Sequence, residues 1–192
     1  MNDIISAGLP LAYEDLLAKC KEIGFTMPSD LYIGSLLKTL ICSKPKANIL
    51  ELGTGIGLTL SWMIDGMDLD STIYSVDNDP QLIRIATDFF GEDKRVNLIC
   101  EDGSAWIKNY SGDLFDLIFA DAWPGKYSDL DLTLELLKPG GFYIIDDMLS
   151  QPNWPEGHQE LVYELIGVLE NRKDLQLTKM NWSTGIIIVV KK

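Results

Sequence analysis

The chain has 192 residues, of which 46% are hydrophobic and 23% are charged, and its net charge is −13. This composition is typical of a globular domain with a full-sized core and excludes a disordered chain. The negative charge disfavours nucleic-acid binding, because phosphate backbones repel an acidic surface and the 16 Lys and Arg residues are scattered along the sequence. We therefore expect a small-molecule ligand.

No segment of the sequence resembles a membrane anchor or a secretion signal. The longest aliphatic run covers residues 186–190, which is far too short to span a bilayer. The N-terminal residues Met1, Asn2 and Asp3 are not a basic segment followed by an apolar run. We therefore expect a cytoplasmic protein without a signal peptide and without membrane contact.

The three cysteines are Cys20, Cys42 and Cys100. Their spacings match no zinc or redox motif. Because free cysteine behaves as a small hydrophobic residue, we interpret all three as core residues.

Two helical stretches come first in the chain, over residues 11–23 and 31–42, and Ser29 or Asp30 can cap the second. Apolar runs then alternate with segments of helical spacing. The predicted strands are 48–52, 72–76, 95–100, 114–120 and 141–145, and the helices between them are 58–64, 81–90, 104–109 and 128–137. This rhythm predicts a parallel sheet with helices on both faces.

The end of the chain has a different pattern. A long helix with one apolar stripe is predicted over residues 156–171, followed by a hairpin of strands 175–182 and 186–190 with a turn at 183–185. We therefore predict an α/β protein with a doubly wound, mostly parallel seven-stranded sheet and a C-terminal antiparallel hairpin. Residues 1–192 are expected to form one domain, with residues 1–45 as an N-terminal helical cap.

A glycine-rich turn after the first predicted strand is the strongest local motif. It reads Gly53-x-Gly55-x-Gly57, with Glu51 two residues before it. Glycines allow a sharp turn and close approach of a ligand. A dinucleotide fingerprint needs its third glycine at position 58, where Leu58 stands. A carboxylate beside this turn favours a cationic ligand over a phosphate.

Acidic residues also follow the next two predicted strands. Asp77 lies 20 residues beyond Gly57, at a strand end where an acid can accept hydrogen bonds from ribose hydroxyls. Asp102, followed by Gly103 and Ser104, ends the third strand, where a carboxylate can bind an exocyclic amine. Because the strands are parallel, these ends face one crevice at the switch point of the sheet.

In this ordered set the chain resembles the class I S-adenosylmethionine-dependent methyltransferases, from about Met27 to the final hairpin. The resemblance implies a Rossmann-like fold and S-adenosylmethionine as the cofactor. It places the methionine moiety near Glu51 and the glycines, the ribose on Asp77, and the adenine near the third strand end. The implied cofactor-binding residues are Glu51, Gly53, Gly55, Gly57, Asp77, Asp102, Gly103, Ser104 and Asp121.

Carboxylates follow the fourth and fifth predicted strands, Asp121 on one and the pair Asp146 and Asp147 on the other. Adjacent carboxylates repel one another, and a divalent cation such as Mg²⁺ commonly relieves this. The pattern looks like the cation-dependent O-methyltransferases of the catechol and caffeoyl-coenzyme A type, which carry an Asp-Asn pair after strand five. Asp147 stands in place of that asparagine. Alternatively, the aspartates only cap strand ends.

Lys126 and His158 are the candidate catalytic bases. The catechol enzymes carry a lysine three residues beyond the first metal aspartate, but this position is Pro124 here and Lys126 follows two residues later. A lysine at that offset either reaches the site or stays in a solvated loop. His158 is either a general base or a residue of the first turn of the last helix. The tryptophans that either wall a substrate pocket or belong to the core are Trp123, Trp154 and Trp182.

The predicted reaction is in-line methyl transfer from a sulfonium to a hydroxyl of a small molecule, with the protein aligning the reacting atoms. Lys126 or His158 would accept the proton, and a divalent metal would lower the pKa of the acceptor. The alternatives are a metal-independent N- or O-methyltransferase, an aminopropyl transferase resembling spermidine synthase, and a catalytically silent cofactor-binding protein. The N-terminal helices could also supply the face of a homodimer.

Overall fold

The computed structural model describes residues 8–151 and 154–192, which include one seven-stranded sheet in the order β3-β2-β1-β4-β5-β7-β6. Strands β1 to β5 pair in parallel, and β7 pairs antiparallel with both β5 and β6. The predicted doubly wound sheet with its C-terminal hairpin is therefore confirmed. The strands are β1 Asn48–Leu52, β2 Thr72–Asp77, β3 Val96–Cys100, β4 Phe115–Ala120, β5 Leu137–Ile145, β6 Leu175–Met180 and β7 Ile186–Lys191.

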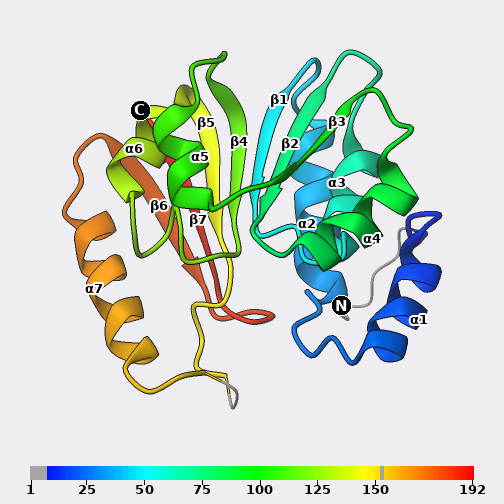
Figure 1. Cartoon of the computed structure of the whole chain (residues 1–192). Helices are drawn as coiled ribbons and strands as arrows, with labels where there is room; N and C mark the ends of the chain where they lie inside the picture. Colours follow the sequence, from blue (N-terminus) through cyan, green and yellow to red (C-terminus); the bar gives the residue numbers. More distant parts are fainter. Residues whose placement is uncertain (1–7, 152–153) are drawn as a thin grey trace.

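Helices cover both faces of this sheet, α1 to α4 on one and α5 to α7 on the other (Figure 1). Strand β4 shows how the sequence serves both layers: Leu117 and Phe119 face the first and Ile118 and Ala120 the second, with the strand period of two. The helices are α1 Tyr13–Ile23, α2 Leu31–Cys42, α3 Leu58–Gly66, α4 Pro80–Phe90, α5 Gly103–Asn109, α6 Leu130–Glu135 and α7 His158–Glu170.

None of the helices in residues 8–151 and 154–192 combines the length and the apolarity needed to cross a bilayer. Residues 1–7, on which the expectation about a signal peptide depends, lie outside the described part of the chain.

The N-terminus of α2 is set by the predicted cap. The side chain of Asp30 accepts hydrogen bonds from the backbone N–H groups of Tyr32 (2.8 Å) and Ile33 (3.0 Å). These amides have no partner within the helix, so the cap satisfies them. Of the two candidates, Asp30 is confirmed as the cap, and Ser29 points elsewhere.

The helix predicted over residues 128–137 is shorter in the structure, where α6 ends at Glu135 and β5 already begins at Leu137. Leu137 pairs with Phe115 of β4 ahead of a register shift in the ladder. Its apolar side chain therefore belongs to the sheet, although it matches the helical spacing as well. Short apolar runs of this kind do not distinguish the two structures.

The interpretation of the cysteines is confirmed for Cys20, which is buried, and wrong for Cys42 and Cys100, which are exposed. Cys100 is the last residue of β3, and β3 is the edge strand of the sheet. An apolar run at an edge is covered on fewer sides than one in the centre, so its terminal residue meets solvent.

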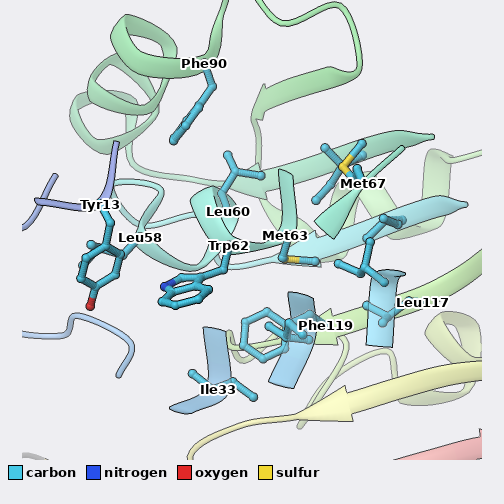
Figure 2. Close-up of a cluster of buried hydrophobic side chains, with 14 of the residues drawn as sticks. Tyr13, Ile33, Leu58, Leu60, Trp62, Met63, Met67, Phe90, Leu117 and Phe119 are labelled. Atoms are coloured by element: carbon cyan, nitrogen blue, oxygen red, sulfur yellow. The ribbon is translucent and has the colours of Figure 1, made fainter. Parts of the chain in front are cut away.

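The side chain of Trp62 in α3 joins the N-terminal helices to the sheet. Its ring is 1% exposed and packs edge-on against Tyr13 of α1, with ring centroids 5.9 Å apart. Figure 2 shows it between Tyr13 on one side and Ile33 and Phe119 on the other. Helices α1 and α2, which cover most of the expected N-terminal cap, thus share one hydrophobic core with the sheet.

This packing makes Gly34 of α2 sensitive to substitution. A Cβ atom at Gly34 would lie 2.4 Å from Cδ1 of Trp62, whereas one at Gly167 of α7 would meet nothing within 4 Å. We predict that Gly34→Ala lowers the free energy of unfolding by about 1–3 kcal/mol through overpacking. The control Gly167→Ala should raise it by up to about 1 kcal/mol, because alanine favours helix. Urea denaturation measures the free energy of unfolding of both variants. Equal changes in the two would contradict the close contact between Gly34 and the ring of Trp62.

Candidate functional site

A cavity of about 710 Å³ lies at the carboxyl ends of β1, β2, β4 and β5. It opens at the switch point between β1 and β4, where ligands commonly bind in doubly wound sheets. The backbone continues its pairing one residue beyond these strands, since Asp121 N–H donates to the carbonyl of Leu52 (2.9 Å) and Gly53 N–H to that of Val76 (2.9 Å). The strand ends are therefore held rigidly around the cavity.

The glycine turn forms one wall of the cavity through Gly53 and Gly55. Both have positive φ angles, +102° and +51°, which L side chains rarely adopt. A Cβ at Gly53 would lie 2.9 Å from the backbone oxygen of Asp121, so β1 and β4 can approach only with glycine there. Gly57 does not line the cavity, and a Cβ there would lie 2.8 Å from the ring of Phe90. Its role is packing between α3 and α4.

Asp77 lines the cavity with both carboxylate oxygens held by backbone amides. Oδ2 accepts a hydrogen bond from Gly55 N–H (2.9 Å) and Oδ1 from Asp79 N–H (3.0 Å). Each carboxylate oxygen has a further lone pair, so the side chain can still accept two hydrogen bonds from a ligand. The same contact fixes the glycine turn against the end of β2.

At the end of β3, Asp102 and Gly103 line the cavity and Ser104 does not. The carboxylate of Asp102 caps α5 by accepting a hydrogen bond from Ala105 N–H (2.9 Å). The hydroxyl of Ser104 instead lies 3.3 Å from that of Ser128. The structure thus brings the first two of these predicted residues to the cavity and directs the third away.

Glu51 is fully buried behind the cavity wall, which requires a correction to the argument made for it. Its Oε2 accepts a hydrogen bond from the hydroxyl of Ser75 (2.5 Å), which lies 2.6 Å from that of Thr54. Burial raises the pKa of Glu51 to about 8, although the Ser75 hydrogen bond opposes the shift. At neutral pH it is a neutral acid that supports the turn, and it presents no charge to a ligand.

The carboxylates of Asp121, Asp146 and Asp147 line the opposite end of the cavity. Asp146 is held in place by Thr184, whose hydroxyl donates to Oδ1, and by the N–H of Asp147 (2.8 Å). Asp147 has a φ of +55°, a left-handed conformation in which Asn and Asp are enriched among non-glycine residues. The hydroxyl of Ser29 donates to Oδ2 of Asp121 (3.3 Å).

These acids shift one another's protonation. Burial raises the pKa of Asp121 well above its ordinary value, and repulsion from Asp146 adds to this. Burial likewise raises the pKa of Asp146 to about 6, against the hydrogen bond from Thr184. Burial raises the pKa of Asp147 too, with the charge of Lys126 opposing the shift. The cluster therefore holds protons more readily than isolated carboxylates do.

Lys126 reaches this cluster, so of the two alternatives left open by the sequence the solvated loop residue is excluded. Its side chain is 4% exposed, lines the cavity and donates from Nζ to the backbone oxygen of Asp146 (2.6 Å). Burial lowers the pKa of Lys126, and the charges of the three aspartates oppose that shift. The loop from Asp121 to Lys126 thus compensates for the two-residue offset that the sequence left open.

The acidic cluster does not fit a divalent cation. Among the described residues, no three acidic, histidine or cysteine side chains converge as metal ligands. Oδ1 of Asp146 is already engaged by Thr184 and by a backbone amide. The buried amine of Lys126 also stands beside the same carboxylates and would repel a second cation. The donor set therefore favours an ammonium group over Mg²⁺.

His158 is the first residue of α7 and lies inside an aromatic cluster at the cavity. Its ring stacks on Trp154, with centroids 4.1 Å apart, and Nε2 lies 2.9 Å from the hydroxyl of Tyr127. Nδ1 is buried and has no hydrogen-bond partner among the described residues. Burial lowers the pKa of His158, and the nearby Lys126 adds to this. The imidazole is therefore neutral at neutral pH.

The remaining tryptophans take separate roles. Trp123 lines the cavity and is half exposed, and Trp154 lines it beside His158. Trp182 is partly buried at the edge of the core, where it packs against Tyr32 with ring centroids 5.3 Å apart.

Sequence reasoning missed two segments that border the cavity. Thr184 comes from the turn between β6 and β7, which was interpreted only as a hairpin turn, and residues 25–29 precede α2. Ser183 of the same turn donates from its hydroxyl to Asp30, the cap of α2. A Ser-Thr pair in a hairpin turn carries no signal of its own, since such turns are commonly polar. Only the placement of β7 beside β5 reveals the contact.

A glycine turn after β1 and an acid at the carboxyl end of β2, both at the switch point of a doubly wound sheet, define a Rossmann-like cofactor-binding domain. Residues 50–148, about half of the chain, match the family model described as a methyltransferase domain, and the chain belongs to that family.

Relatives and solved structures agree with this. The chain is 30% identical over 118 residues to a provisionally named O-methyltransferase of Mycolicibacterium paratuberculosis; the match covers 59% of the chain and 53% of that protein. The chain thus spans about half the length of the curated relatives it matches.

Two crystal structures show the same fold over nearly the whole chain. The O-methyltransferase TomG from Streptomyces achromogenes, in complex with SAM, has a TM-score of 0.86 at 18% identity and covers 98% of this chain and 92% of its own. The O-methyltransferase from Bacillus cereus, in complex with SAH, has a TM-score of 0.83 at 19% identity and covers 98% and 94%.

The buried acid Glu51 gives a pH-dependent prediction. Its pKa rises from 4.5 to about 8 on folding, so between these values the folded state holds a proton that the unfolded state loses. Stability should therefore fall as the pH rises through this window, by ~1.4 kcal/mol per pH unit from this group.

Glu51→Gln should remove this contribution, because glutamine does not titrate. Urea unfolding of both proteins at two pH values inside the window measures the difference in slope. Parallel slopes for wild type and variant would show that Glu51 is not protonated in the folded protein.

Proposed function

We propose that this protein is an S-adenosylmethionine-dependent methyltransferase that transfers a methyl group to a hydroxyl of a small molecule. One observation carries the proposal: a single cavity joins the glycine turn and Asp77 at one end to Lys126 and His158 at the other. The first end suits a nucleoside cofactor, and the second suits activation of a hydroxyl. The family match and the O-methyltransferase names of the relatives support it.

The residues at the first end fit S-adenosylmethionine. Asp77 has two free acceptor positions for the ribose hydroxyls, Asp102 and Gly103 border the adenine side, and the open backbone at Gly53 and Gly55 allows the methionine moiety to approach. Asp121 also lines the cavity and, when ionised, would attract a sulfonium cation. When bound, this cofactor supplies a methyl group activated by the positive sulfur. Glu51 supports the glycine turn from behind through Ser75 and Thr54, whereas Ser104 and Gly57 do not line the cavity.

His158 is the proposed general base. Its neutral imidazole lines the cavity, its buried Nδ1 has no partner among the described residues, and Tyr127 and Trp154 fix the ring. With Nδ1 as the acceptor, Nε2 carries the hydrogen and donates to the hydroxyl of Tyr127. Lys126, the other predicted base, lies against the carbonyl of Asp146. Trp123 and Trp154 form the apolar wall against which the acceptor would lie.

A divalent cation held by Asp121, Asp146 and Asp147 is the alternative to a site without metal. The roles given to Asp77 and His158 do not depend on this cation. The donor set described above disfavours it. An aminopropyl transferase and a catalytically silent cofactor-binding protein remain the alternatives to methyl transfer. The cytoplasmic location and the homodimer stay predictions.

Cofactor binding should depend on Asp77. We predict that Asp77→Ala weakens the binding of S-adenosylmethionine by about 1–3 kcal/mol, because two ribose hydroxyls and the amide of Gly55 lose their acceptor. The matched control is Asp70→Ala, which removes the same charge from an exposed ion pair with Lys46 and should leave affinity unchanged. Calorimetric titration measures both, and wild-type affinity in Asp77→Ala would contradict the assignment of the cofactor site.

Catalysis should be visible as transfer of labelled methyl from S-adenosylmethionine to a panel of phenols, catechols and amines. We expect a hydroxyl compound to be methylated. His158→Asn should lower kcat on the order of 100-fold or more, through loss of the base, with little change in affinity for S-adenosylhomocysteine. Transfer only to amines, or transfer of an aminopropyl group from the decarboxylated cofactor, would contradict the proposal. Binding without turnover on the whole panel would favour the silent alternative.

A further inference from the structure

The amine of Lys126 is buried at the cavity without a close counter-ion. Of its three possible hydrogen bonds, one goes to the backbone oxygen of Asp146. Among the described residues, no carboxylate oxygen lies within 4.0 Å of Nζ. Two N–H groups are therefore available to a ligand in the cavity, although the side chain is only 4% exposed.

Three carboxylates still surround this amine at longer range. Burial lowers the pKa of Lys126, and the charges of Asp121, Asp147 and Asp146 oppose that shift. All four side chains line the same cavity. The ammonium group thus provides a positive charge among these acids, in the place where a metal ion would otherwise provide it.

The position of Lys126 depends on the loop after β4. The carbonyl of Gly125 accepts a hydrogen bond from the hydroxyl of Tyr143, a fully buried residue of β5. The N–H of Lys126 donates to the carbonyl of Trp123 (3.2 Å). These contacts hold the loop in a fixed path, so the amine is positioned by the fold and does not enter from solvent.

We propose that the ammonium group of Lys126 serves in place of a divalent cation in the acceptor subsite, where it binds the reacting hydroxyl oxygen directly. The inference rests on the proposed function and specifies its acceptor site. Lys126 would donate one of its free N–H groups to the acceptor oxygen and stabilise negative charge that develops there. An ammonium in this place makes the reaction independent of added metal.

The proton of the acceptor hydroxyl goes to His158 and not to Lys126. The acceptor oxygen loses its proton to Nδ1 of His158 and forms the bond to the methyl carbon, whose bond to sulfur breaks with both electrons left on sulfur. Lys126 keeps its protons throughout. The products are the methyl ether, the neutral thioether and an imidazolium, which then releases its proton to solvent.

The test compares wild type with Lys126→Met, which keeps the length of the side chain and removes its charge. The matched control is Lys19→Met, which removes an equal charge from a surface pair with Glu22. Mn²⁺ binding is followed by electron paramagnetic resonance, S-adenosylhomocysteine binding by calorimetry, and methyl transfer with and without EDTA. Thermal melting checks that each variant is folded.

We expect wild type and Lys19→Met to bind no Mn²⁺ at millimolar concentration and to keep full activity in EDTA. Lys126→Met should lose kcat on the order of 100-fold or more, with unchanged affinity for S-adenosylhomocysteine. It should also gain Mn²⁺ binding, because three carboxylates then lack a neighbouring positive charge.

The proposal is overturned if wild type binds Mn²⁺ at a site that Asp146→Asn removes, if EDTA abolishes activity, or if folded Lys126→Met gains no Mn²⁺ binding or keeps wild-type kcat. If Lys126→Met does not fold, the proposal is still tested by the wild-type protein, because Mn²⁺ binding or loss of activity in EDTA would overturn it. A chain that binds no S-adenosylhomocysteine and methylates no acceptor contradicts the proposed function instead, while the Mn²⁺ titration continues to test the ammonium site.

Discussion

The parallel pairing of β1 with β4 is the contact on which the rest of the site depends. It ends with Asp121 N–H bound to the carbonyl of Leu52, and it brings the backbone of Asp121 so near Gly53 that no side chain fits between them. The proposed cofactor end and the proposed acceptor end of the cavity begin on these two adjacent strands. A shift of β4 along β1 would therefore move the loop that carries Lys126, and that contacts His158 through Tyr127, away from the glycine turn.

The cavity concentrates polar groups that folding alone would not favour. Asp121 and Asp146 have raised pKa values, Lys126 has a lowered one, and Nδ1 of His158 has no partner within residues 8–151 and 154–192. Burial of such groups costs stability unless they are paired, and perturbed titration is common at functional sites. The large apolar layers on both faces of the sheet offset that cost. Glu51 differs from these groups, because it supports the wall and lies behind the cavity.

Periodic patterns predicted the fold well because they report burial directly. The strand predicted over residues 48–52 and the helix over 31–42 have the same bounds in the structure. The prediction failed where one apolar run satisfied two patterns, as at Leu137, and where the edge of the sheet left Cys100 uncovered. For the site, the spacing of the motifs predicted that Asp77, Asp102 and Asp121 would lie near one another, because the carboxyl ends of parallel strands share one edge of the sheet. All three residues line the same cavity.

By itself the sequence determined the positions of the strands, the glycine turn and the acids at the strand ends, because these depend on residues close together in the chain. Only the tertiary structure decided which side chains face the cavity. Strand ends fix where a residue lies, but the loop after β4 brings Lys126 to the aspartates, and the hairpin turn brings Thr184 to Asp146. Both contacts join residues 20 or more positions apart. Their geometry therefore depends on how β5 and β7 pack, which no local pattern of residues encodes.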